Sequence, residues 1–255
     1  MYLMPQVIYE LKKIEDTAKI ISSFYNDDLT IYGRFPTAIA SNFNINIDEL
    51  VGKTIDEKYD IILKLITPIY EKNIKEMRAK IKEYQKYWNK NADFVCKELE
   101  KIFNIRFDGV EKCYAYVNIN TTCPRYLDSH SFDVNFRKTK EQALEVCIHE
   151  IIHFYWFQKW KEKYPNCPEE NFQAPHIEWL LSEIVIDQIV YYSEFRKIMR
   201  EKPAYYYFYD TVIPGLGNLI QIFRKLYSEN NIDNFMEKGI NLLKAYPELV
   251  KELTN

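Results

Sequence analysis

The sequence predicts a mainly helical α+β protein, and three observations lead to this fold class. Glycine is scarce, with 6 residues among 255, which disfavours a loop-rich or repeat-built β architecture. Apolar residues recur at intervals of three and four in several long segments, as they do in amphipathic helices. Two short segments near the middle of the chain are instead rich in β-branched and aromatic residues with alternating polarity, which is typical of strands.

Residues 1–108 are predicted to form a helical N-terminal region. Residues 5–26 carry apolar positions at helical spacing, which predicts a first helix. Residues 27–55 are expected to be loop with a short helix. Thr67 and Pro68 have the pattern of an N-cap followed by a first-turn proline, which predicts that a long helix begins there.

Residues 109–255 are predicted to contain a small sheet. Lys112–Asn120 and Ser131–Phe136 are the two expected strands, because both segments alternate and are rich in aromatic or β-branched residues. Thr139 and Gln142 then have the spacing of a capping box, which predicts that a helix starts directly after the second strand.

Two core helices and a helical tail are expected after the strands. The first helix is predicted to run through His149 to about Tyr164, and the second from Ile177 to about Arg200. Residues 201–255 are expected to contain two or three short helices. The sheet would lie over the two core helices, and the two regions are compatible with one continuous domain.

Composition narrows the setting and the partners of the chain. The net charge of −3 gives no reason to expect nucleic acid or an anionic membrane as partner. The longest apolar runs are too short to span a bilayer, and the N-terminus lacks the pattern of a signal peptide. The five cysteines form no C-x-x-C pair, which favours a reducing, cytoplasmic setting; a Cys113–Cys123 bridge is the alternative.

The strongest chemical signal is the pentapeptide HEIIH at residues 149–153. Residues four apart lie on one face of a helix, so His149 and His153 can meet one ion. Zinc accepts neutral imidazole nitrogens, and a catalytic zinc site has three protein ligands and one open position for water. Glu150 is the expected general base of such an H-E-x-x-H site. The alternative is a core helix with two satisfied histidines.

The downstream helix decides the class of zinc site. A metzincin would need a glycine and a third histidine soon after the motif, where Trp156 and Lys159 stand instead. Residues 149–187 resemble the gluzincin metallopeptidases, the clan of thermolysin and the M1-type aminopeptidases. This resemblance implies a zincin-like core, Glu183 as third zinc ligand, and Asp187 as the carboxylate that orients a ligand histidine.

The resemblance has limits and leaves several residues open. Ser182 stands where thermolysin-like enzymes often have asparagine, and the G-x-M-E-N signature of the M1-type aminopeptidases is absent, so the subfamily stays open. Glu178 is the rival third ligand. The clan also uses a histidine or tyrosine to stabilise the transition state. His176 is the provisional choice, and the alternatives are His130 and the tyrosines at positions 191, 192, 205, 206, 207 and 209.

These residues lead to three functional hypotheses. The first is a cytoplasmic zinc metallopeptidase that acts on a peptide or protein substrate, with one of the two predicted strands binding the substrate along its edge. The second is a zinc amidohydrolase on the same scaffold that acts on a small amide. The third is a non-catalytic, zinc-stabilised binding protein. The sequence does not specify the substrate or the oligomeric state.

Overall fold

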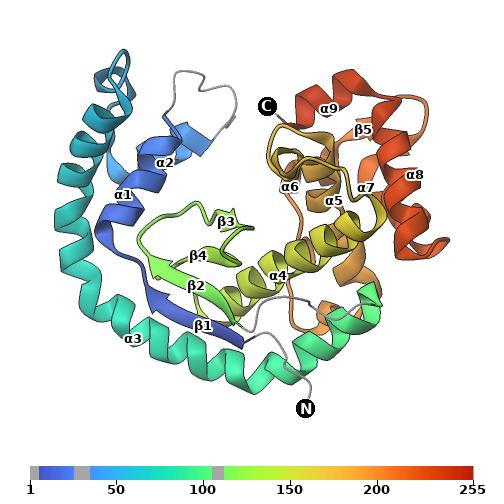
Figure 1. Cartoon of the computed structure of the whole chain (residues 1–255), viewed down its shortest axis with the longest axis horizontal. Coiled ribbons are helices and arrows are strands. Elements are labelled where there is room, and N and C mark those ends of the chain that lie inside the picture. Colours follow the sequence, from blue (N-terminus) through green and yellow to red (C-terminus); the bar gives the residue numbers. More distant parts are fainter. Residues whose placement is uncertain (1–5, 26–34, 105–111, 255) are drawn as a thin grey trace. The chain divides into compact units, whose positions relative to one another are not determined.

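The computed structural model describes residues 6–25, 35–104 and 112–254, and the chain is mainly helical with a small mixed sheet (Figure 1). The α+β fold class predicted from the sequence is therefore confirmed. The chain divides into two compact units. The first unit comprises residues 1–92 and 110–147, and the second comprises residues 93–109 and 148–255.

The two units divide the chain differently from the predicted regions 1–108 and 109–255. The strands that follow residue 110 belong to the first unit, because they pair with a strand at the start of the chain, β1 (Gln6–Leu11). The sheet has the order β1-β2-β4-β3, in which β1, β2 and β4 are parallel and β3 is antiparallel to β4. The other three strands are β2 (Lys112–Asn118), β3 (Arg125–Tyr126) and β4 (Ser131–Asn135).

The predicted strands are confirmed as β2 and β4, but the predicted helix over residues 5–26 is wrong in its first half. Residues 6–11 form β1, and helix α1 covers only Ile14–Ser23. Val7 and Tyr9 alternate into the core, so the same apolar positions also satisfy the period of a strand. Pairing with β2, more than 100 residues away, decides between the two periods.

Strand β2 offers no open edge for an extended peptide, and in the described part of the chain only the last residues of β4 lack a strand beside their outer edge. Strand β2 lies between β1 and β4, and the first residues of β4 are covered by β3. The outer edge of β1 is occupied too, because the amide of Gln85 accepts a hydrogen bond from Tyr9 N (2.9 Å) and donates one to Val7 O (2.9 Å). A side chain therefore occupies backbone groups to which another strand could otherwise pair.

Gln85 belongs to α3 (Ile55–Phe103), a helix of 49 residues that begins earlier than predicted. Thr54 and Glu57 form a capping box, in which Thr54 N donates to Glu57 Oε2 (2.8 Å) and Glu57 N donates to Thr54 Oγ1 (3.3 Å). The predicted start at Thr67-Pro68 is wrong, and Pro68 lies inside the helix. Shorter elements, α2 (Phe35–Phe43) and the 3-10 helix Ile47–Glu49, precede α3.

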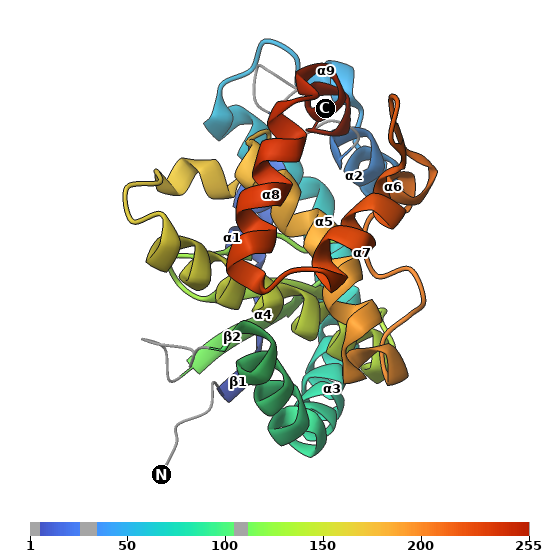
Figure 2. The same ribbon diagram turned by 90° about the vertical axis from the view of Figure 1, so that its right-hand side faces the viewer.

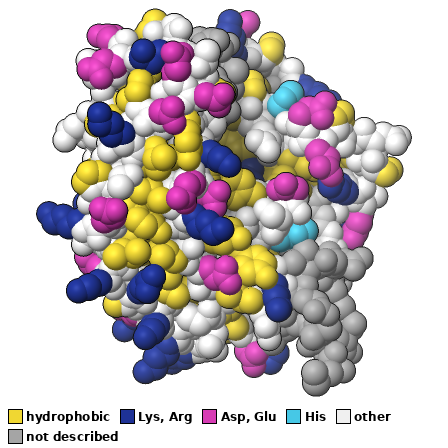
Figure 3. Space-filling view, turned by 60° about the vertical axis from the view of Figure 1, so that its left-hand side comes forward, with side chains coloured by type: hydrophobic (Ala, Val, Ile, Leu, Met, Phe, Trp, Pro, Cys, Tyr) yellow, Lys and Arg dark blue, Asp and Glu magenta, His cyan; other side chains and the backbone are white. Residues whose placement is uncertain are grey.

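Charged side chains of both signs are mixed on the face of the molecule drawn in Figure 3, with apolar side chains between them. This mixture agrees with the small net charge of the chain. Among the described residues, no helix combines the length and the apolar character needed to cross a membrane.

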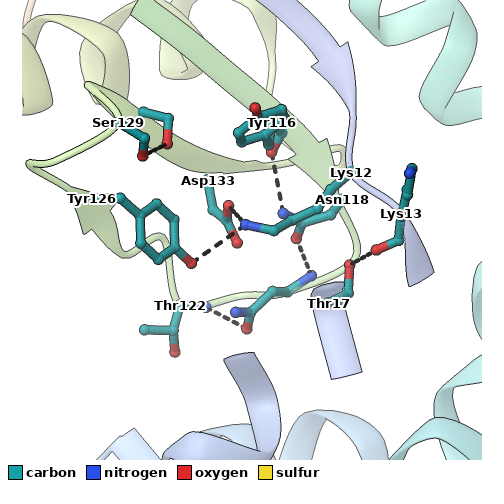
Figure 4. A network of polar contacts seen from close by, with 11 residues as sticks. Lys12, Lys13, Thr17, Tyr116, Asn118, Thr122, Tyr126, Ser129 and Asp133 are labelled. Atoms are coloured by element: carbon teal, nitrogen blue, oxygen red, sulfur yellow. Dashed lines mark hydrogen bonds and ion pairs between the residues drawn. The ribbon is translucent and has the colours of Figure 1, made fainter. Parts of the chain in front are cut away.

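The first unit contains a buried ion pair at the end of β1 (Figure 4). Lys12 is 7% exposed and donates to the fully buried Asp133 of β4 (Nζ–Oδ1 2.5 Å) and to the hydroxyl of Tyr126 (3.3 Å). The ammonium also lies 4.6 Å from the ring centre of Tyr126 and 5.2 Å from that of Tyr116. These contacts replace part of the hydration that both charges lose on burial.

The burial of Asp133 makes the stability of the protein depend on pH. Burial raises the pKa of Asp133 from 3.8 to about 6, and Lys12 opposes that shift only in part. Because the folded-state pKa lies above the unfolded value, the contribution of Asp133 is full below about pH 4 and is lost as the pH rises through about 6. Relative to Asp133→Asn, we expect the unfolding free energy of the wild type to fall by on the order of 2 kcal/mol over this window. Urea unfolding of both proteins between pH 4 and pH 7 measures this difference. If the unfolding free energies of the wild type and of Asp133→Asn changed equally with pH, the prediction would be contradicted.

The second unit is built around two helices that the sequence predicted. Helix α4 (Lys140–Lys163) begins at the expected capping box, where Thr139 N donates to Gln142 Oε1 (3.0 Å) and Gln142 N donates to Thr139 Oγ1 (3.2 Å). The part of α4 from residue 148 onward belongs to the second unit. Helix α5 (Ile177–Tyr192) ends before the predicted Arg200, because Ser193 is extended and caps a 3-10 helix, η4.

The remaining elements of the second unit pack around α5. Helices α7 and α8 both contact α5, and α6 contacts α7 (Figure 2). A short antiparallel hairpin, β5 and β6, precedes α7. The expectation that residues 201–255 form short helices is thus confirmed, but residues 201–254 contain four of them instead of two or three. Besides α4 and α5, the second unit contains η3 (Glu169–Phe172), η4 (Glu194–Lys197), α6 (Tyr206–Asp210), β5 (Val212–Ile213), β6 (Gly217–Asn218), α7 (Leu219–Ser228), α8 (Ile232–Lys244) and α9 (Pro247–Thr254).

Candidate metal centre

Three side chains of the second unit point their donor atoms at one another. The Nε2 atoms of His149 and His153 lie 3.1 Å apart. One carboxylate oxygen of Glu183 lies 3.5 Å from His149 Nε2, and the other lies 3.4 Å from His153 Nε2. The three residues form a group that could hold a metal ion, and it is the group that the sequence predicted.

Helix geometry explains why these residues meet. His149 and His153 lie one turn apart on α4, so their rings project from the same face of the helix. Glu183 comes from the middle of α5, where every residue from Leu180 to Val190 is buried. Residues 150–157 of α4 are likewise buried, and His149 is partly exposed, so most of the donor group is surrounded by apolar side chains.

Aromatic packing holds the ring of His153. Phe157, one turn further along α4, is stacked on this imidazole with ring centres 6.2 Å apart and an interplanar angle of 16°. Phe157 is stacked in turn on the buried Phe172 of η3, with ring centres 4.4 Å apart. The two phenylalanine rings thus form an apolar column that packs beside His153.

The donor atoms lie close enough together to surround one metal ion. Zinc–nitrogen and zinc–oxygen bonds of about 2.0–2.1 Å at tetrahedral angles separate neighbouring ligand atoms by about 3.3 Å. The two imidazole nitrogens lie 3.1 Å apart, each nitrogen lies 3.4–3.5 Å from a different oxygen of Glu183, and one donor atom from each residue can be chosen so that all three lie within 4.8 Å of one another. Two imidazoles and a carboxylate are also a ligand set that catalytic zinc uses. The residues present therefore fit a zinc ion.

Burial differs among the three residues in a way that matters for access. The side chains of His153 and Glu183 are 0% and 3% exposed, whereas that of His149 is 23% exposed. An ion held by these donors would thus lie at the boundary between the apolar interior and solvent, on the side of His149. Solvent therefore reaches the donor group at His149, which is the side from which the water ligand of a catalytic site would have to come.

Glu150 is placed differently from the three donors. It follows His149 on α4, is only 6% exposed, and is not a member of the donor group. A residue beside a ligand histidine points about 100° away from it around the helix axis, which separates the carboxylate from the ligand face. This position suits a base more than a metal ligand.

Asp187 has other contacts than the sequence predicted. We expected Asp187 to orient a ligand histidine. Instead, its fully buried carboxylate accepts two hydrogen bonds from Arg224: Nε donates to Oδ2 (2.7 Å) and Nη2 donates to Oδ1 (2.9 Å). Tyr209 also donates its hydroxyl to Oδ1 (2.7 Å). The expected contact is thus replaced by a bidentate ion pair, since a guanidinium matches a buried carboxylate in both charge and shape.

Arg224 and Tyr209 were not singled out as partners of Asp187 by sequence reasoning. Tyr209 is partly buried and hydrogen-bonded to the carboxylate. Burial, which is the larger cause, and this hydrogen bond, which is the second, raise the pKa of Tyr209 well above its usual value. The guanidinium of Arg224 also lies 3.9 Å from the ring centre of Tyr191. The sequence signal that could have pointed to Arg224 is its position directly after Phe223, a buried residue on the apolar face of α7, where an arginine needs a partner for its charge.

The other residues considered for the site lie apart from the donor group. Glu178 stands in the first turn of α5 and is not a member of the group, so the structure brings Glu183 to the histidines instead. His176 is the half-buried residue before α5, and the contacts of the described residues do not join its side chain to the three donors. His130 belongs to the first unit and has a left-handed backbone (φ 44°).

Most of the candidate tyrosines have structural contacts. Tyr207 donates its hydroxyl to Leu253 O (3.2 Å), and Tyr205 is stacked on Tyr207 with ring centres 5.5 Å apart. Tyr192 is stacked on Tyr227 (5.8 Å). Tyr206 is 65% exposed. The residue that would stabilise a transition state is therefore not assigned by these contacts.

All five cysteines are described and carry thiols, so the alternative of a Cys113–Cys123 bridge is not realised in the structure.

Comparison with known proteins adds no relative: no protein-family model matches the chain, and neither a curated protein nor a solved structure matches it significantly. The geometry of the donor group therefore carries the functional argument.

Proposed function

We propose that the chain is a zinc-dependent metallopeptidase of the gluzincin kind, with a zincin-like core formed by α4 and α5. His149, His153 and Glu183 hold the zinc ion, and Glu150 is the general base. The observation that carries this proposal is the convergence of His149, His153 and Glu183, two of which belong to the H-E-x-x-H motif and whose donor atoms lie within 4.8 Å of one another. The proposed substrate is a peptide or protein, and the proposed setting is the cytoplasm.

The chemistry follows from the donor set and from Glu150. A zinc ion held by His149, His153 and Glu183 would supply a Lewis acid, able to polarise a carbonyl and to lower the pKa of a water molecule toward about 7. Glu150 accepts the proton of the attacking water and delivers it to the leaving amine. The position of Glu150 next to His149, outside the donor group, favours this role, because the base of an H-E-x-x-H site lies beside the ion without binding it.

The metal content of the protein tests the ligand set. We expect about one zinc per chain by plasma mass spectrometry, because three preformed ligands converge on one point. Glu183→Ala should weaken zinc binding by at least about 100-fold, since removal of a carboxylate that only supports a ligand already costs about 10- to 100-fold. Competition with a chromophoric chelator measures this affinity.

The matched control is Glu178→Ala, which removes a carboxylate from the same helix. We expect this variant to bind zinc like the wild type, because Glu178 does not belong to the donor group. If Glu183→Ala retained zinc and Glu178→Ala lost it, Glu178 would be the third ligand in place of Glu183. A wild-type protein that takes up no zinc, even when zinc is added, would remove the basis of the proposed activity.

A further inference from the structure

A pocket of about 260 Å³ lies in the second unit against the guanidinium that holds Asp187. Arg224 lines this pocket together with residues at the start of α7 and two residues before α6. Arg224 has five N–H donors, and Asp187 uses two of them. Within the described residues, no hydrogen bond uses the other three. The arginine therefore has donors available to an incoming acceptor.

The guanidinium is also fixed in place. Its bidentate bond to Asp187 sets its plane, the ring of Tyr191 lies against it, and its side chain is only 18% exposed. A donor group that is already immobilised loses little conformational entropy when it binds a ligand. Arg224 therefore differs from an exposed surface arginine, which would have to be ordered first.

The charges that line the pocket favour one negative charge in the ligand. Lys202 adds a second cation, and its ammonium lies 5.2 Å from the ring centre of Tyr209. The exposed Glu201 adds one negative charge. The lining side chains of Arg224, Lys202 and Glu201 together carry one positive charge, so a singly charged, planar carboxylate suits this pocket better than a phosphate dianion.

The pocket is tied to the proposed metal centre through α5. Asp187 follows Glu183 by four residues, so the two side chains lie one helical turn apart, with Cβ atoms about 5–6 Å from each other. The pocket is smaller than those that enclose drug-sized ligands, which start at about 300 Å³. It therefore suits the last residue of a chain better than a longer segment.

We propose that Arg224 and Lys202 form a subsite for the free C-terminal carboxylate of a peptide. The identification of the ligand as a peptide rests on the proposed metallopeptidase function, whereas the preference for a carboxylate rests on the pocket alone. In this arrangement Arg224 determines specificity and takes no part in the chemistry.

Binding of a matched pair of probes tests the subsite. N-acetyl-dialanine and its C-terminal amide differ only in the carboxylate, and the side-chain Nε–H resonances of arginine report binding by NMR. We expect the acid to bind about tenfold more tightly than the amide, because a charge-assisted bidentate hydrogen bond forms only with the acid. Equal affinities, or tighter binding of inorganic phosphate than of the acid, would overturn the proposal.

Two variants locate the binding. Lys202→Gln should weaken binding of the acid by about two- to fivefold, as expected for one exposed charge. Lys225→Gln removes a charge from an exposed neighbour of Arg224 that does not line the pocket, and should leave the affinity unchanged. Arg224→Lys keeps a cation beside Asp187 but lacks the planar fork, and should lose the preference for the acid. A preference that survives in Arg224→Lys would contradict the assignment.

The Glu183→Ala variant separates this subsite from the metal centre. It removes a proposed zinc ligand but no residue of the pocket, so the preference for the acid should persist in it. Loss of the preference in Glu183→Ala would mean that the carboxylate binds at the metal and not at Arg224. Persistence together with absent peptidase activity in the wild type would retain the carboxylate subsite and reject only the proposed function.

Discussion

Replacement of Glu150 by glutamine is expected to reduce peptide hydrolysis by about 10²- to 10⁴-fold, the usual contribution of a general base, while the zinc content stays at the wild-type level. Glutamine has the same shape as glutamate but cannot accept the proton of the attacking water. Glu150 is not a member of the donor group, so its replacement removes no proposed ligand. Peptide hydrolysis and metal content are measured on the same purified sample.

Two further variants make this result specific. His153→Ala should lose both zinc and activity, because it removes a donor atom that faces the other two. Glu162→Gln changes an exposed carboxylate on the same helix, which is paired only with Lys159 on the surface in the contacts of the described residues, and should retain both. Full activity in Glu150→Gln, with wild-type contamination excluded, would reject the zinc-peptidase mechanism.

The donor group could be predicted because its geometry is local. His149 and His153 are four residues apart on one helix, and the period of the helix alone places them together. The capping-box spacing of Thr139 and Gln142 predicted where that helix begins, and the structure contains both hydrogen bonds of the capping box. Glu183 required a resemblance to known enzymes, since no local rule specifies which carboxylate of the next helix faces the histidines.

The errors arise where contacts between distant segments decide the structure. Residues 6–11 satisfy both a helical and a strand period, and only pairing with β2 makes them a strand. Asp187 stands at the position of an orienting carboxylate, but Arg224, 37 residues later, takes both of its oxygens. A single sequence contains no spacing rule that joins these two residues, so the ion pair could not be predicted from it.

Replacement of Arg224 by methionine is expected to lower the free energy of unfolding by about 3–5 kcal/mol, the usual cost of removing one partner of a buried ion pair. Asp187 is fully buried, so its carboxylate would keep only the hydroxyl of Tyr209 as a hydrogen-bond donor among the described residues. Urea unfolding followed by circular dichroism measures the change. Lys225→Met, at the exposed neighbouring position, should change the unfolding free energy by less than about 0.5 kcal/mol.

A double-mutant cycle distinguishes the cost of an unpaired charge from a general loss of packing. If the unpaired carboxylate causes the loss, Asp187→Leu combined with Arg224→Met should be more stable than Arg224→Met alone, because a buried ion pair can be replaced by apolar groups of similar volume at little cost. Additive losses from the two single substitutions would instead mean that Arg224 acts mainly through its contact with Tyr191. Because Asp187 lies one turn from Glu183, zinc affinity measured across the same cycle then shows whether the ion pair also positions the third ligand. A zinc affinity that falls in the single variants and recovers in the double variant, in parallel with stability, would show that α5 and its ligand are held by charge balance at Asp187.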